Sequence, residues 1–367
     1  MKNDVELKKE TTAPEGKVKA FLKKKGIEIT WKRYLIDAMS SMASGLFASL
    51  LIGTIIGTLG TQLNIPVLVD VGTYAKGVAG PAMAVAIAYA LKAPNLVLFS
   101  MLAVGAASNS LGGAGGPLAV LVIAIVATEF GKLVSKETKI DILVTPLVTI
   151  GVGVLLAMGI APWIGKGASS LGQLIMIATE LQPLLMGIIV SVIVGIALTL
   201  PISSAAICAA LSLTGLAGGA AVAGCSAQMI GFAVMSYREN KVGGLISQGL
   251  GTSMLQMSNI IKNPKIWIAP ILTSAITGPI ATCVFKMQMN GEAISSGMGT
   301  CGLVGQIGVY TGWLNDIAAG TKTGIVAMDW IGLVLICFVL PAVLTFIFGE
   351  LFRKIGFIKE NDLKLDV

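Results

Sequence analysis

Side chains that could bind a polar solute gather where the long apolar stretches of this 367-residue chain are interrupted. They offer uncharged hydrogen-bond donors and acceptors beside glycine backbone, an arrangement that suits a neutral polyol such as a sugar. Each of them, taken alone, could instead bond one helix to another. Their concentration at the chain breaks predicts a substrate-binding site, and the candidates are Asn109, Ser203, Ser204, Gln228 and Gln306.

One carboxylate joins these candidates. Glu180 lies in Ala178-Thr-Glu-Leu-Gln-Pro183, where a polar stretch meets an apolar one. A carboxylate at membrane depth is costly, so it should face a cavity and meet a partner or the hydroxyls of a substrate. Pro183 would break the helix nearby and free backbone groups for a polar ligand. We therefore expect Glu180 to bind substrate, with a solvated residue at the outer surface as the alternative.

Residues that would support other chemistry are missing. The chain has no histidine, which removes the commonest general base and metal ligand and any phosphohistidine. Its five cysteines form no Cys-x-x-Cys pair, so we expect buried small hydrophobes and no disulfide framework. Gly297-Met-Gly-Thr-Cys-Gly302 matches a dinucleotide-binding pattern but follows a polar loop where a strand is needed. We expect no catalytic residue, no metal and no cofactor in this chain.

The elements that must position the candidates are membrane helices. Hydrophobic residues make up 55% of the chain and charged residues 12%, and the mean hydropathy is +0.86. Several apolar runs reach the roughly 20 residues that cross ~30 Å of hydrocarbon, and the alternation of a membrane barrel is absent. The sequence predicts an all-α polytopic membrane protein of the cell membrane.

The net charge of +7 is explained by the membrane. Lysine and arginine precede the first apolar span and occupy short connections, which is the positive-inside pattern. This pattern predicts that both termini are cytoplasmic. The N-terminal one is a basic segment over 1–30 with an amphipathic stretch, and the C-terminal one is a tail over 353–367. The transport domain then covers 31–352. No helix-turn-helix precedes the spans, so we expect no nucleic-acid partner.

Two stretches, 94–134 and 201–235, share one layout. Each opens with a proline after an apolar span and continues through a short apolar run, a glycine cluster (Leu111–Gly116 and Leu216–Gly219) and a second run. Such glycine-broken segments in corresponding halves point to a transporter's binding site. We predict two re-entrant hairpins, with short tilted helices that cross fully as the alternative.

The remaining apolar runs complete a pseudo-repeat of span, span and hairpin, followed by two further spans. With the hairpin arms, the chain would have about ten membrane segments. The expected spans are 34–59, 78–91, 142–163, 183–200, 266–285 and 330–348, with an outer amphipathic stretch over 165–182. Gly53-Thr-Ile-Ile-Gly57 in the first span predicts a face for close helix contact.

Six stretches make the chain resemble the second group of phosphotransferase-system EIIC membrane proteins, some of which are labelled as toxin regulators of the perfringolysin-regulator type. The resemblance begins near residue 34 and covers nearly all of the rest. The stretches are Ile140–Pro146, Thr179–Gly187, Leu198–Ala206, Gln228–Ser236, Gln248–Met254 and Gly299–Gly308.

The resemblance implies a sugar permease, a homodimer, that delivers its substrate to a cytoplasmic phosphorylating partner. Glucose-type EIIC proteins bind sugar with a glutamate and a histidine. Glu180 is similar to that glutamate's short motif, whereas this chain has no histidine to match the second residue. It also lacks an EIIB-type cysteine followed by basic residues, so EIIA and EIIB would be separate proteins.

Two further functions stay open from the sequence. The chain could be a membrane sensor or regulator that keeps the EIIC scaffold and binds a ligand without transport. It could also be a gradient-driven secondary transporter that uses Glu180, Asp37 or Asp70.

Overall fold

A computed structural model describes residues 17–179 and 181–365. That part of the chain is helical, and its one β-bridge joins Gly215 to Met289. Its α-helices are α1 (Lys17–Lys24), α2 (Ala38–Leu46), α3 (Ile52–Gln62), α4 (Pro66–Gly77), α5 (Ala79–Ala90), α6 (Asn95–Gly112), α7 (Gly116–Val134), α8 (Asp141–Thr179), α9 (Pro183–Thr199), α10 (Ser204–Ala210), α11 (Gly215–Met235), α12 (Tyr237–Ile246), α13 (Met257–Lys262), α14 (Ile268–Pro279), α15 (Val304–Ala318), α16 (Ala327–Val334) and α17 (Leu340–Lys354).

Short 3₁₀ or π segments continue or link these helices. They are η1 (Lys32–Asp37), η2 (Phe47–Leu51), η3 (Gly113–Gly115), η4 (Ser247–Gly251), η5 (Ser253–Gln256), η6 (Pro264–Trp267), η7 (Ile280–Val284), η8 (Ala293–Gly297), η9 (Cys301–Leu303) and η10 (Leu335–Val339). The helical class expected from the sequence is therefore confirmed.

Six helical segments of the described chain are long and apolar enough to cross a membrane. Two shorter apolar helices, α5 and α9, accompany them. These lengths and compositions support a multi-pass membrane protein, whereas the expected count of about ten segments is not confirmed. The six segments are Lys32–Gln62, Asn95–Val134, Asp141–Ser170, Gly215–Met235, Pro264–Val284 and Ala327–Lys354.

The first predicted hairpin has two long arms. Helices α6 and α7 contain 18 and 19 residues and are joined by η3, where Gly113 adopts a positive φ of 50°. At 1.5 Å per residue each arm is about 27 Å long, close to the thickness of a bilayer's hydrocarbon core. Re-entry of this hairpin stays a prediction.

The second predicted hairpin is asymmetric. Its first arm, α10, has 7 residues, and its second arm, α11, has 21. The turn falls before the glycine cluster, at Ser212 and Gly215, which both have positive φ. The cluster lies in the first turns of α11. Its Gly219 serves close packing, since a Cβ there would be 1.9 Å from the carbonyl oxygen of Met287. A chain break and a packing glycine look alike in sequence.

Helix α8 extends well past the predicted span 142–163. It runs without a break through 39 residues, including Pro162, and so joins the predicted span 142–163 to the predicted outer stretch 165–182. Gly165 serves close packing there, since a Cβ would lie 2.6 Å from the carbonyl oxygen of Gly112 at the tip of the first hairpin. One helix therefore reaches from the first half of the chain to the start of the second.

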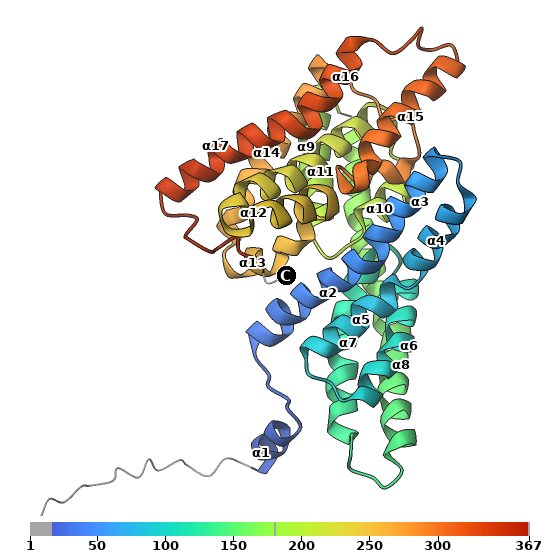
Figure 1. Ribbon diagram of the computed structural model, residues 1–367, viewed down its shortest axis with the longest axis vertical. Helices are drawn as coiled ribbons and strands as arrows, with labels where there is room; N and C mark the ends of the chain where they lie inside the picture. The colour runs from blue at the N-terminus through green and yellow to red at the C-terminus, as the bar shows by residue number, and fades with distance from the viewer. Residues whose placement is uncertain (1–16, 180, 366–367) are drawn as a thin grey trace, which may run out of the picture.

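Helix α11 is the centre of the second half. It packs against α9, α14 and α17, and these helices form the upper part of the view in Figure 1, above α5 to α8. In the first half, α3 and α4 form a close pair: a Cβ on Gly72 would lie 2.7 Å from the Cα of Gly57. The predicted helix contact of the Gly53–Gly57 face is confirmed, with its partner in the same chain.

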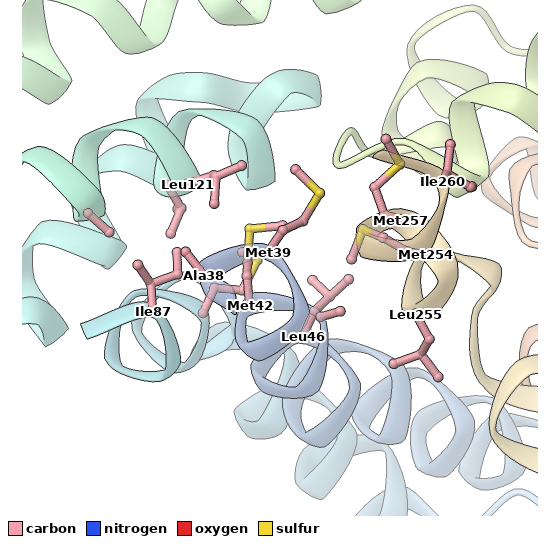
Figure 2. Close-up of a cluster of buried hydrophobic side chains, with 14 of the residues drawn as sticks. Ala38, Met39, Met42, Leu46, Ile87, Leu121, Met254, Leu255, Met257 and Ile260 are labelled. Carbon is pink, nitrogen blue, oxygen red and sulfur yellow. The ribbon is translucent and has the colours of Figure 1, made fainter. Parts of the chain in front are cut away.

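A methionine-rich core joins α2 to the later segments η5 and α13 (Figure 2). Met39 and Met42 of α2 belong to the same buried cluster as Met254 and Met257. Leu363, near the end of the described chain, is fully buried in that cluster. The beginning of the membrane part and the C-terminal segment therefore share one buried cluster.

Ionic contacts attach the N-terminal segment to the end of the first hairpin. The buried ammonium of Lys132 donates to the carbonyl oxygens of Gly26 (2.8 Å) and Leu91 (3.0 Å) and pairs with Glu129 at 3.0 Å. The ammonium of Lys25 pairs with Glu137 at 2.5 Å. The hydrogen bond and charge of Lys25 lower the pKa of Glu137.

Candidate functional site

A cavity of about 400 Å³ lies beside the residues that follow Glu180. Glu180 itself falls outside the described residues, but Gln182 and Pro183 both line the cavity. The cavity joins this motif to the second hairpin through Leu216 and to the chain after η7. Its complete described lining is Gln182, Pro183, Leu184, Leu216, Thr282, Cys283, Lys286 and Gln288. We call it the Gln182 cavity.

The Gln182 cavity carries few but varied polar groups. Two amides (Gln182 and Gln288) and one hydroxyl (Thr282) offer donors and acceptors, and Lys286 supplies the charge within the described lining. The hydroxyl of Thr282 donates to the carbonyl oxygen of Pro183 at 2.8 Å, which ties η7 to the start of α9. Pro183 begins α9, because its fixed φ and missing N–H suit a first helical turn.

A second cavity, of about 280 Å³, shares Lys286 and Gln288 with the first. Its walls come from the chain after η7, from α15 and from α16. Lys322 pairs with Asp329 at 2.9 Å, and the amide of Asn290 donates to both oxygens of Asp316 (3.0 and 2.9 Å). The buried Trp313 also lines the cavity, and its ring meets the ring of Trp330 edge to face. The segment around Lys286 and Gln288 thus contributes to the walls of both cavities.

A third cavity, of about 530 Å³, lies at the tip of the first hairpin between Gly113 and Lys166 of α8. Asn109 lies on α6 directly before Ser110, which lines this cavity. Position 116 requires glycine here, since a Cβ would lie 2.5 Å from Oδ1 of Asn109. Asn109 is half-buried at this junction and does not line the Gln182 cavity.

The two candidate serines connect the second hairpin to other parts of the chain. Ser203 caps α10, accepting from the N–H of Ala206 at 3.1 Å, and its own N–H donates to the carbonyl oxygen of Ala114 at the first hairpin tip (2.9 Å). Ser204 is buried and donates to the carbonyl oxygen of Gly297 at 2.7 Å. These bonds bring the breaks of both hairpins together, but they use the serines for structure.

Gln228 has a structural role as well. It is fully buried on α11, where its carbonyl oxygen accepts from the indole N–H of Trp267 at 2.9 Å and from the hydroxyl of Thr199 at 3.3 Å. Its amide donates to Ser274 at 3.3 Å. Bonding between helices, the alternative considered for each candidate, accounts for all of these contacts.

Gln306 keeps an unused acceptor. Its amide donates to the hydroxyl of Ser226 at 3.4 Å, while its buried Oε1 accepts no hydrogen bond. A buried acceptor without a partner costs free energy, so this atom has capacity for a further hydrogen bond. It does not line any of the three cavities.

Sequence reasoning missed Lys286, Gln288 and Asp316. One signal was present: Lys286 ends an apolar run and is followed by alternating apolar and polar residues, Met287-Gln-Met-Asn290. For the cysteines, burial is confirmed at Cys208, Cys225, Cys301 and Cys337, and Cys283 is exposed. Within residues 17–179 and 181–365, no group of three histidine, cysteine or acidic residues is placed to hold a metal.

Comparison with known proteins identifies the family. The family model described as "Phosphotransferase system, EIIC" matches residues 36–365. No curated protein and no solved structure matches the chain. Because the matched region covers most of its length, the chain belongs to the phosphotransferase-system EIIC family.

Proposed function

We propose that this protein is the sugar-binding permease component of a phosphotransferase system and that it binds its solute in the Gln182 cavity. Its family already makes it a membrane component of such a system. The observation that carries the proposal is the meeting, in one cavity, of the Gln182–Pro183 motif, the second hairpin and Gln288. A volume of about 400 Å³ falls in the range of small-molecule sites.

The lining suits a polyhydroxylated solute. Each glutamine amide can donate to one hydroxyl and accept from another, and the ammonium of Lys286 can donate to a ring or hydroxyl oxygen. Leu184 and Leu216 provide apolar contact for the carbon face of a sugar ring. Glu180, two residues before Gln182, would add a carboxylate that accepts from hydroxyls, as its resemblance to the family's glutamate implies.

Phosphate would come from another protein. The chain contains no histidine, and most of its cysteines are buried. The exposed Cys283 is followed by Val284 and Phe285, without the basic residues of an EIIB-type site. We therefore propose that separate EIIA and EIIB proteins phosphorylate the sugar. From the family resemblance we further propose a homodimer, and from the positive-inside pattern that both termini face the cytoplasm.

Proteoliposomes test this function. The full chain, supplied with phosphorylated EIIB, should take up a labelled sugar and release it inside as sugar phosphate. Gln288→Leu should lower uptake at least tenfold, since two hydrogen bonds to the solute would be lost. Gln62→Leu, on an exposed part of α3 outside the three cavities, should not. Uptake without any sugar phosphate would exclude the coupled mechanism.

One observation favours the sensor alternative. The N-terminal segment is attached directly to the end of the first hairpin, through Lys25 and Ser135 (2.5 Å) and through Lys132 and Gly26. A conformational change in that hairpin would therefore move the N-terminal segment, which could dock a partner. Deleting residues 1–30 discriminates: a sensor should lose signalling and keep ligand binding. For gradient-driven transport, neither Asp37 nor Asp70 lines any of the three cavities, and the third candidate, Glu180, lies outside the described residues.

A further inference from the structure

The second cavity has a lining whose charges balance. Two lysines and two aspartates line it within the described chain, namely Lys286, Lys322, Asp316 and Asp329. Lys322 and Asp329 pair with each other at 2.9 Å, so Lys286 and Asp316 are the charged groups left to meet a ligand. An anion would be repelled by Asp316 and a cation by Lys286. The lining therefore favours a neutral ligand, and we call this space the Asp316 cavity.

Asn290 orients two polar groups of the lining. Its Nδ2 donates to both oxygens of Asp316 (3.0 and 2.9 Å) and to Oε1 of Gln288 at 3.0 Å. Each carboxylate oxygen has lone pairs for about two hydrogen bonds, so each oxygen of Asp316 can accept one more. The same contact turns the carbonyl oxygen of the Gln288 amide toward Asn290 and leaves its NH₂ group to donate. An oriented acceptor and an oriented donor thus line one cavity.

Contacts outside the cavity hold Asn290 itself. Its Oδ1 accepts from the N–H of Gly215 at 3.1 Å, and its carbonyl oxygen accepts from the side-chain amide of Asn315 at 3.1 Å. Helix α15 packs closely here, since a Cβ on Gly312 would lie 2.6 Å from the nitrogen of Asn290. The polar groups are therefore oriented before a ligand binds, and such preorganisation lowers the cost of binding. Through Gly215 they are also connected to the turn of the second hairpin.

A buried tryptophan supplies a further donor. Trp313 lines the cavity and is only 5% exposed, and its ring meets that of Trp330 edge to face at 5.2 Å between centroids. Within residues 17–179 and 181–365, its indole N–H makes no hydrogen bond. A tryptophan buried this deeply usually finds a partner for that group. A ligand hydroxyl in the cavity would supply the missing acceptor.

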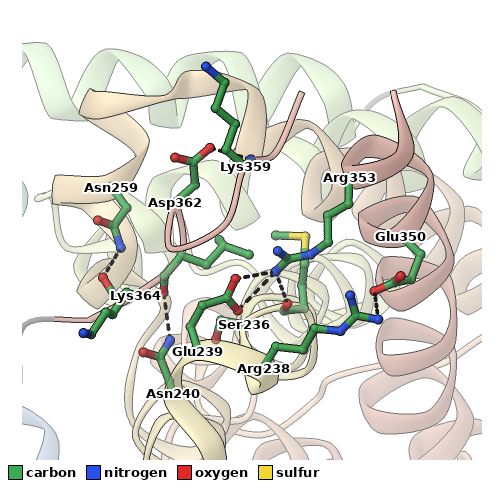
Figure 3. A network of polar contacts seen from close by, with 12 residues as sticks. Ser236, Arg238, Glu239, Asn240, Asn259, Glu350, Arg353, Lys359, Asp362 and Lys364 are labelled. Carbon is green, nitrogen blue, oxygen red and sulfur yellow. Dashed lines mark hydrogen bonds and ion pairs between the residues drawn. The ribbon is translucent and has the colours of Figure 1, made fainter. Parts of the chain in front are cut away.

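The polar network near the end of the chain behaves differently (Figure 3). The guanidinium of Arg353 donates to Glu239 at 2.8 Å, and Asp362 accepts from the side-chain amide of Asn263 at 2.7 Å. These groups serve one another, and none of them lines any of the three cavities. In the Asp316 cavity, by contrast, polar groups with capacity for further hydrogen bonds line an open space.

On the basis of the function proposed above, we propose that the Asp316 cavity is a second binding site for the neutral, polyhydroxylated solute, occupied before the Gln182 cavity. Asp316 accepts from one hydroxyl, and Gln288 and Trp313 donate to others, which suits groups that are donor and acceptor at once. The volume of about 280 Å³ lies near the lower end of small-molecule sites and suits a single sugar ring. The two cavities share Lys286 and Gln288, so a solute in either meets the same two side chains.

Tryptophan fluorescence of the full chain in nanodiscs tests this site. The probes are D-glucose, D-mannose, D-galactose and D-mannitol, and at least one should give a saturable change that Trp313→Phe removes. Asp316→Asn should weaken this binding about tenfold, because a charged acceptor is replaced by a neutral amide. The matched control is Asp70→Asn, at an exposed position of α4 outside the three cavities, which should leave it unchanged.

Three results would overturn the assignment. They are the absence of a saturable change with all four probes, equal affinity in Asp316→Asn, and a response to the zwitterion glycine in place of the polyols. If Asp316→Asn does not fold, Met328→Tyr decides the question. Met328 lines the cavity and is 61% exposed, so the larger ring should fill the space without disturbing the core. The fluorescence response should then disappear, and a response that persists would place the solute elsewhere.

Uptake kinetics separate this site from the proposed function. In the proteoliposome assay, Asp316→Asn should raise KM about tenfold and leave kcat unchanged, since the capture of the solute is weakened. Uptake with the same KM in Asp316→Asn would refute the second site and leave the permease function standing. Polyol binding that depends on Asp316, without uptake of any probe, would refute the permease function and leave the site standing.

Discussion

The substitution Gly224→Ala tests how the second half of the chain is packed. A Cβ on Gly224 of α11 would lie 1.9 Å from the carbonyl oxygen of Ser191 and 2.5 Å from its carbonyl carbon, both backbone atoms of α9. Since carbon contacts settle near 3.5 Å, the two helices would have to separate by about 1.5 Å. Overpacking of this kind costs about 1–3 kcal/mol, and a shift of backbone belongs at the upper end of that range.

The α9 side of the same contact is also closely packed, so α9 has no free space into which it can shift. A Cβ on Gly195 of α9 would meet the carbonyl oxygen of Gly224 at 2.8 Å, so the helices already touch there. We expect Gly224→Ala to lower the free energy of unfolding by about 2 kcal/mol, which is the upper-end packing cost less the roughly 1 kcal/mol that alanine adds to a helix. The unfolding midpoint should fall by at least a few degrees.

The matched control is Gly151→Ala on α8, where nothing lies within 4 Å of the added Cβ. There alanine should stabilise the helix by up to about 1 kcal/mol or change nothing. Heated samples of both variants, followed by size-exclusion chromatography in detergent, give the two midpoints. Equal midpoints, or a higher one for Gly224→Ala, would refute the reasoning from helix contact.

Three other predictions concern the ends of the chain and the cavity. Lys132→Met leaves the buried carboxylate of Glu129 without its cation and should cost about 3–5 kcal/mol in thermal unfolding; adding Glu129→Gln should recover most of it. The pKa of Glu137 is lower in the folded protein than in the unfolded chain, so its contact with Lys25 stabilises the fold at any pH above the pKa of the unfolded chain. This stabilisation is lost as the pH falls through the pKa of the folded state. Acid should therefore speed proteolysis of the N-terminal segment, and Glu137→Gln should abolish that dependence; an unchanged pH profile would contradict the contact. Gly219→Ala, with a Cβ 1.9 Å from backbone of the chain after η7, should reduce solute uptake several-fold, and unaltered uptake would show that the cavity tolerates the shift.

The helical class and the membrane setting could be predicted from the sequence because apolar runs of sufficient length have few other stable structures. Several helix starts were also visible, since Pro183 opens α9 where a proline is favoured. The continuity of α8 could not be predicted in this way. Gly165 looks like a break until the approach of Gly112 is known, and that approach joins residues 53 positions apart.

The candidate site was harder to predict for the same reason. Ser204 bonds to Gly297 and Gln228 bonds to Trp267, so the partners that use up these side chains come from distant parts of the chain. A single sequence shows that a polar side chain is present but not whether its hydrogen bonds are already made within the protein. Lys286 was overlooked because a lone lysine after a span is also what the charge rule places at any helix end.

The unbroken course of α8 has a mechanical consequence. At 1.5 Å per residue its 39 residues form a rod of about 58 Å. Its first part packs against α6 and α7, and it ends at Thr179, three residues before Gln182. If the first half tilted by about 10°, the far end of such a rod would swing through about 10 Å. A tilt of the first half would therefore also displace the end of α8, which lies close in the chain to the Gln182 cavity.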